Sequence, residues 1–269
     1  MLEIEILEKV VAAVRRGARY RDIDEGLVRR VAAAELAKGR RVKEAVKAAR
    51  SKLHQVAGAY IEKQIGYTQL IEQLEGLPAD QSDPDLQSFC RQAMQFHTST
   101  LERLPILENF YSQTLLSIAP IRSVLDLACG LNPLALPWMP LSEDVEYHAC
   151  DIYTDMVDFL QLFLEHLNIN GNAFLCDLVE TIPSNQVHLA LLLKTIPCLE
   201  QLDKSIAPRL LDSIHAEHIL VSFPVHSLGG RSKGMLENYE ARFRQLLTGR
   251  SWQVQRYEFA SELAFLISR

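Results

Sequence analysis

The chain has 269 residues and 48% of them are hydrophobic, enough to form the core of one large domain or of a large and a small one. Its 28 basic and 34 acidic residues give a net charge of −6. No apolar run reaches the roughly 18 residues of a membrane helix. The first ten residues hold three glutamates and no apolar segment typical of a signal peptide. We therefore expect a cytoplasmic protein with no membrane partner.

The five cysteines never form a Cys-x-x-Cys pair. Four of them lie in or beside apolar, strand-like runs. This distribution is typical of buried, reduced thiols and not of a zinc site or a disulfide framework. We expect no bound metal.

Positive charge is concentrated near the N-terminus. Residues 1–60 contain 14 basic and 8 acidic side chains, a net charge of +6, whereas the remaining 209 residues contain 14 and 26, a net charge of −12. A basic segment on an acidic body is typical of proteins that bind a polyanion. A solvated helical face with surplus lysine and arginine would give the same counts, so composition leaves both interpretations open.

The first 118 residues have the periodicity of helices. Asp24 is a plausible N-cap for the second of them. The polar face of the third carries Lys43, Lys47, Arg50 and Lys52. Helices are predicted over 4–14, 27–36, 42–59, 64–74, 85–96 and 99–117.

From residue 121 the pattern changes to short apolar runs that alternate with helices. Strands are predicted over 122–128, 145–151, 172–177, 187–194 and 218–224, and helices over 155–167, 199–216 and 235–247. This alternation predicts βαβ units around a parallel sheet. Two further runs within 252–268 are too close for a parallel crossover, so they predict an antiparallel hairpin. The combination is typical of α/β proteins of the Rossmann-like methyltransferase class.

The most informative feature is the corner after the first strand. The strand breaks at Ala128-Cys129-Gly130 and the chain is expected to resume as a helix, while Asp151 ends the next strand 21 residues after Gly130. A small-residue turn lets the backbone approach a nucleotide-type cofactor, and the carboxylate accepts both ribose hydroxyls. With a single glycine, S-adenosylmethionine fits better than a dinucleotide, because it has no phosphate. An ordinary strand–turn–helix corner is the alternative.

Other polar residues follow the remaining strands. Asp177 can accept from the adenine amine, with Leu178 against the ring, and Lys194 and Thr195 end the fourth strand, where a transferase holds its acceptor. Arg103 offers a fork to the methionyl carboxylate, although its surroundings also look like a helix start.

The fifth strand ends in Ser222 and Phe223, before a loop with Arg231, Lys233 and three glycines. Glycine combined with arginine and lysine suits phosphate contacts, and Phe223 can stack on a base. A surface loop beside an ordinary core phenylalanine is the alternative.

Six segments carry a family resemblance: LHQVAGAY (53–60), HTSTLERL (97–104), VLDLACGLNPLAL (124–136), CDI (150–152), LLLKTIPCLEQ (191–201) and VSFPVHSLGGRSKGMLENY (221–239). In order and spacing they resemble the aminoglycoside-resistance 16S rRNA methyltransferases. The resemblance is loose before about residue 41. It implies a Rossmann-like, class I S-adenosylmethionine-dependent methyltransferase domain over 97–269, and an N-terminal all-helical, basic, ribosome-docking domain over 1–96.

The family implied methylates N7 of guanine 1405 in the 30S ribosomal subunit, which confers aminoglycoside resistance; we expect a monomer. By the resemblance, the cofactor site is lined by Tyr60, His97, Arg103, Gly130, Asp151, Ile152, Asp177, Leu178, Lys194 and Thr195. The resemblance also implies that four residues face the target base: Ser222, Phe223, Arg231 and Lys233. We expect rRNA contacts from the basic residues Arg40, Arg41, Lys43, Lys47 and Arg50.

Guanine N7 has an in-plane lone pair and no proton to lose, so methyl transfer there needs positioning and charge stabilisation but no general base. The target base must leave its stack to reach the cofactor. Three alternatives stay open: methylation of another rRNA site, methylation of a small molecule, and a non-catalytic RNA-binding module. A small-molecule enzyme would have no use for the basic segment, and a binding module would not need Asp151.

Overall fold

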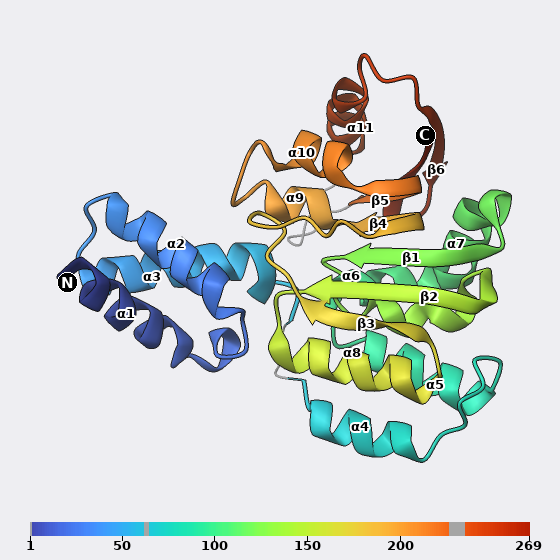
Figure 1. The fold of residues 1–269 in the computed structure, drawn as a ribbon, viewed down its shortest axis with the longest axis horizontal. Helices are drawn as coiled ribbons and strands as arrows, with labels where there is room; N and C mark the ends of the chain where they lie inside the picture. Colours follow the sequence, from blue (N-terminus) through green and yellow to red (C-terminus); the bar gives the residue numbers. More distant parts are fainter. Residues whose placement is uncertain (1, 62–64, 226–234) are drawn as a thin grey trace.

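Figure 1 shows a computed structural model of the chain, which describes residues 2–61, 65–225 and 235–269. The strands of the described part form one seven-stranded sheet in the order β3-β2-β1-β4-β5-β7-β6. Their bounds are β1 (Ile121–Leu127), β2 (Leu141–Asp151), β3 (Asn170–Leu175), β4 (Gln186–Leu193), β5 (His215–Pro224), β6 (Gln253–Glu258) and β7 (Glu262–Ser268). The first five are parallel, and β7 runs antiparallel to both β5 and β6. The predicted fold, including the final hairpin, is confirmed.

Alternate residues of the central strands enter two separate cores. Val124 and Leu191 pack with the helix α8 (Thr154–His166), whereas Leu125 and Leu192 pack with the opposite layer. That layer contains α9 (Thr195–Leu199), α10 (Ile206–Ser213) and α11 (Met235–Leu246). Because both faces are covered, β4 is apolar without interruption from Leu189 to Leu193.

The helices that precede the sheet are α1 (Leu2–Arg15), η1 (Ala18–Tyr20), α2 (Glu25–Ala37), α3 (Val42–Leu53), η2 (His54–Gly58), α4 (Tyr67–Glu75), α5 (Pro84–Met94), α6 (Thr98–Arg103), η3 (Leu104–Ile106), α7 (Leu107–Leu115) and η4 (Leu116–Ile118). The predicted N-cap of α2 is confirmed, since the Asp24 carboxylate accepts the backbone N–H of Leu27 at 2.8 Å. In the described part of the chain, no helix has both the length and the apolar character to cross a membrane.

These helices divide into two groups according to what they contact. Helices α1, α2 and α3 pack against one another and lie beyond the carboxyl ends of the parallel strands (Figure 1). Helices α4 and α5 instead pack on the sheet unit: Tyr67 contacts Phe159 of α8, and Arg91 lies over Trp138. The helical domain expected to end at residue 96 therefore contains two groups, because the apolar faces of α4 and α5 are buried against the sheet unit.

Two predicted helices have a different form. After Gly130 the chain forms a 3₁₀-helix, η5 (Asn132–Trp138), because Pro137 inside it lacks the N–H that a regular α-helix would use. The helix predicted over 199–216 is shorter and begins only at Ile206. Before it, the Asp203 carboxylate accepts the backbone N–H of Ser205 at 2.8 Å and forms a local turn. The end of that range already belongs to β5.

Candidate functional site

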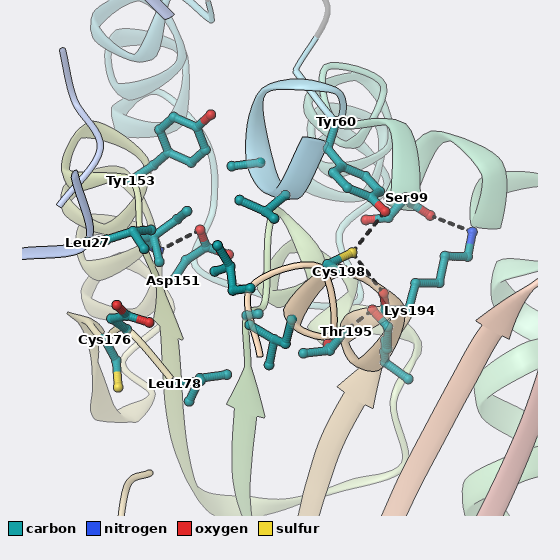
Figure 2. A pocket seen from close by; sticks show the side chains of 18 of the residues that line it. Leu27, Tyr60, Ser99, Asp151, Tyr153, Cys176, Leu178, Lys194, Thr195 and Cys198 are labelled. Carbon is teal, nitrogen blue, oxygen red and sulfur yellow. Dashed lines mark hydrogen bonds between the residues drawn. The ribbon is translucent and has the colours of Figure 1, made fainter. Parts of the chain in front are cut away.

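A pocket lies at the carboxyl ends of the parallel strands, where the N-terminal helices meet the sheet (Figure 2). It contains about 700 Å³ of space, including its open mouth. Strands β1, β2 and β3 extend to one side of the sheet, and the chain then crosses back to β4, which pairs with the other side of β1. Parallel sheets bind ligands at such a switch point. Eight of the ten predicted cofactor residues line it: Tyr60, His97, Asp151, Ile152, Asp177, Leu178, Lys194 and Thr195.

Gly130 and Asp151 form the corner that their spacing predicted. The N–H of Gly130 donates to Asp151 Oδ2 at 2.9 Å, and the N–H of Ile152 donates to Oδ1 at 2.7 Å. Gly130 has φ +53°, and a Cβ atom there would lie 2.7 Å from the His97 ring, so glycine is required on both counts. Each carboxylate oxygen can accept a second hydrogen bond. Asp151 can therefore still bind a ribose.

Burial raises the pKa of Asp151, and hydrogen bonds from three backbone N–H groups oppose that rise. These donors stabilise the ionised form, which accepts hydroxyl groups most strongly. The corner thus supplies an oriented carboxylate at the floor of the pocket.

His97 and Tyr60 form an aromatic wall of the pocket. Their rings stack with centroids 5.8 Å apart, and the Tyr60 hydroxyl lies 2.9 Å from Cys198 Sγ. Burial, together with the charges of Arg103 and Lys194, lowers the pKa of His97 to about 4. The imidazole is therefore neutral at neutral pH and adds no positive charge to the pocket.

Arg103 was expected to line the cofactor site, but its side chain is not among those that line the pocket, and each of its three nitrogens already donates to a protein partner. Nε and Nη2 bind the Glu262 carboxylate at 3.1 and 2.7 Å, and Nη1 binds Asn132 Oδ1 at 2.9 Å. The side chain is 1% exposed. Burial disfavours the charged guanidinium, yet Glu262 raises its pKa overall. Because Glu262 occupies the guanidinium fork, Arg103 presents no free fork to a methionyl carboxylate.

Glu262 is the residue that the sequence analysis missed. It begins β7, is fully buried, and accepts a hydrogen bond from Ser222 Oγ at 2.5 Å. Lys194 Nζ lies 3.5 Å from its carboxylate and also binds Glu102 at 2.7 Å. A glutamate that starts an otherwise apolar strand was the available signal, since a buried charge requires partners.

Ser222 and Phe223 were expected to face the target base, but both are inside the protein. Phe223 is 3% exposed and stacks on Tyr239 with ring centroids 5.1 Å apart. Phe243 and Phe265 enclose its other sides. Phe223 is thus a core residue here, because three aromatic neighbours cover it.

Arg231 and Lys233, the other two residues assigned to the target base, lie outside the described residues. Their assignment stays a prediction.

Comparison with known proteins places this fold and pocket in a family. The family described as "Ribosomal RNA methyltransferase (FmrO)" matches residues 16–266. The chain belongs to this family. The predicted family resemblance is confirmed.

Named relatives are similar to this rRNA methyltransferase over almost their whole length. A 16S rRNA (guanine(1405)-N(7))-methyltransferase of Micromonospora rosea is 36% identical over 265 residues, which cover 98% of this chain and 97% of the relative. One of Serratia marcescens is 32% identical, with 98% of both chains covered. The crystal structure of the 16S rRNA methyltransferase RmtF in complex with S-adenosyl-L-homocysteine has a TM-score of 0.82 and 31% identity, with 98% of both chains covered.

The five predicted RNA-contacting residues of this rRNA methyltransferase have unequal environments. Arg40 pairs with the buried Glu35 at 2.6 Å. Arg50 donates to the Ala13 carbonyl at 2.6 Å and so holds α3 against the end of α1. The other three are exposed and form no salt bridge with any residue that the structure describes: Arg41, Lys43 and Lys47.

One group of side chains outside the pocket has metal-ligand chemistry. Ligand atoms of His188, Glu217 and His218 lie within 4.8 Å of one another on β4 and β5. The backbone N–H of Arg122 points at His188 Nδ1, 3.4 Å away. This contact leaves the ring proton on Nε2 and weakens His188 as a ligand. We assign no metal to the group.

Proposed function

We propose that this rRNA methyltransferase transfers the methyl group of S-adenosylmethionine to N7 of guanine 1405 in 16S rRNA of the 30S subunit, and thereby confers aminoglycoside resistance. The observation that carries the proposal is the Gly130–Asp151 corner, a close-approach glycine bonded to an oriented carboxylate at the switch point of the sheet. The names of the relatives from Micromonospora rosea and Serratia marcescens support the choice of target.

The residues around the pocket suit the parts of this cofactor, which supplies a methyl group on a positively charged sulfur. Asp151 would accept the ribose hydroxyls, and Asp177 with Leu178 would hold the adenine. Tyr60 and the neutral His97 would border the rest of the cofactor without repelling its charge. RmtF, which is similar over the whole chain, was solved with S-adenosyl-L-homocysteine.

The chemistry requires little more from the chain than placement. Guanine N7 attacks with a lone pair and releases no proton, so the enzyme has to align the two reactants and exclude water. We keep Arg231 and Lys233 as the candidates for holding the flipped nucleotide. Since Ser222 and Phe223 are buried, we propose that they stabilise the end of β5 and do not contact the target base.

We further propose that α1, α2 and α3 dock the enzyme on the small subunit, as a monomer in the cytoplasm, where ribosomes are found. Arg41, Lys43 and Lys47 are exposed at the start and along one face of α3. Cations that form no salt bridge with any described residue are available to neutralise phosphates and release counterions. A shaped docking surface is needed because A-form RNA hides its base edges in a deep groove.

The deciding experiment is methyl transfer in vitro, followed by mass spectrometry of the RNA. The wild type should place one methyl group on a single guanine N7 of 30S particles and little on protein-free 16S rRNA, and folded Asp151→Ala should be nearly inactive on both. Equal rates on the two RNAs would remove the docking proposal. Methylation of a small molecule with 30S inert would remove the proposed function.

The docking surface is tested by salt-dependent binding to 30S particles. Charge reversal at Arg41, Lys43 and Lys47 should weaken binding and flatten its dependence on salt, while cofactor affinity stays unchanged. Arg122→Glu is the control, because Arg122 is 67% exposed near the amino end of β1, at the opposite end of the parallel strands from α3. Unchanged binding in the triple variant would mean that the basic face of α3 is only solvated and does not contact the subunit.

A further inference from the structure

The arginine in the middle of α2 reaches across to the cofactor pocket. Arg30 Nε and Nη2 donate to Asp177 Oδ2 at 3.0 and 2.6 Å, and Nε also lies 3.1 Å from Glu180. The Asp177 side chain is 8% exposed, so this ion pair is largely shielded from water. Arg30 and Asp177 are 147 residues apart in the sequence, and Arg30 is not itself among the residues that line the pocket.

The orientation of Asp177 depends on this contact. Its other oxygen, Oδ1, accepts the backbone N–H of Val179 at 3.1 Å. One local bond alone leaves a carboxyl group free to rotate about its terminal torsion, which has a broad energy minimum. The second anchor, from Arg30, fixes the plane of the carboxylate. It fills both acceptor positions of Oδ2 and leaves Oδ1 able to accept one more hydrogen bond.

Helix α2 is itself fixed to the neighbouring strand end. The backbone N–H of Asp24 donates to the Ile152 carbonyl, and that of Thr154 donates to the Asp22 carbonyl, both at 2.8 Å. Leu27 of the same helix lines the pocket (Figure 2). The helix therefore bridges the carboxyl ends of β2 and β3, and Arg30 is its contact with the second of them.

We propose that Arg30 is a positioning residue for the adenine end of the cofactor pocket: it holds the Asp177 carboxylate for the exocyclic amine. The inference rests on the proposed cofactor and deepens it, because selectivity for adenine then depends on a helix of the RNA-docking group. Without Arg30, Asp177 turns away and the pocket still accepts the ribose through Asp151 but loses its preference for an amine over a keto oxygen.

The test is calorimetry with two ligands, S-adenosylhomocysteine and its inosine counterpart, in which a keto oxygen replaces the amine. The wild type should prefer the adenine ligand by roughly tenfold or more, the value of one hydrogen bond to a charged acceptor. In Arg30→Ala the preference should fall to about threefold or less, and Arg30→Lys should restore part of it. Arg29→Ala is the matched control, because Arg29 pairs with Glu8 and Glu25 and should keep the full preference.

The ratio of the two affinities separates positioning from general loss of structure, since a loosened pocket weakens both ligands alike. Full preference in a folded Arg30→Ala protein overturns the inference while leaving the proposed function intact. A wild type with no preference overturns it too, because Asp177 then does not contact the amine. A wild type that binds neither ligand removes the proposed cofactor and this inference together.

Discussion

The carboxyl ends of β2 and β5 are stabilised in opposite ways. At the end of β2, Asp151 is held by the backbone N–H groups of Gly130 and Ile152, which are 22 positions apart in the sequence. At the end of β5, Ser222 is held by the side chain of Glu262 from another strand. Local backbone bonds tolerate changes elsewhere in the molecule, whereas the β5 end depends on a buried network of charges and aromatic rings.

The largest effect should come from breaking that network at Glu262. Glu262→Ala leaves Arg103 and Lys194 buried without their shared carboxylate, which should lower the free energy of unfolding by about 3–5 kcal/mol. Urea denaturation measures the loss. The control is Glu108→Ala, whose exposed pair with Arg91 should contribute about 1 kcal/mol or less. Equal losses in the two variants would contradict the dependence of the β5 end on Glu262.

Phe223 separates a core role from a base-stacking role. Phe223→Ala leaves a cavity among Tyr239, Phe243 and Phe265 and should lower the free energy of unfolding by about 3 kcal/mol. Phe223→Leu should lose less than about 1.5 kcal/mol and keep methyl transfer to 30S particles close to wild type. A stable Phe223→Leu protein with greatly reduced turnover would indicate that Phe223 contacts the target base.

These two regions also show what the sequence could predict. The parallel sheet, the hairpin and the Gly130–Asp151 corner followed from spacing, because they depend on local periodicity and on one backbone contact. The surroundings of Phe223 and Arg103 could not be predicted, because their partners, Phe265 and Glu262, come from a distant strand whose register is set only by the folded sheet. The 3₁₀ form of residues 132–138 was predictable from its prolines but was read as an ordinary helix.

Removing the carboxylate at the β2 end should affect the ligand more than the fold. Asp151→Ala should weaken S-adenosylhomocysteine binding by roughly 2–3 kcal/mol, because charge-assisted hydrogen bonds to the ribose are lost. Calorimetry measures the affinity, and Asp158→Ala, exposed on α8, should be unaffected. Wild-type affinity in a folded Asp151→Ala protein would overturn the role of Asp151.

The smallest effect concerns two buried groups whose pKa values move in opposite directions. Burial, with Arg103 and Lys194 nearby, lowers the pKa of His97 to about 4, whereas burial raises the pKa of Asp126 to about 6, opposed mainly by hydrogen bonds from neighbouring side chains. Below pH 6.5 the unfolded chain protonates His97 first, so that group destabilises the fold as the pH falls. Asp126 takes up its proton first in the folded state, so it stabilises the fold over the same range.

The two effects nearly cancel in the wild type, and single variants should expose each one. Between pH 6.5 and 5.5, His97→Gln should gain about 1 kcal/mol of stability relative to the wild type, because the unfolded imidazole no longer takes up a proton. Over the same range Asp126→Asn should lose stability relative to the wild type, by a smaller amount. Urea denaturation at several pH values measures both. If the free energy of unfolding changed in the same direction in both variants, the pH dependence would arise from other titratable groups.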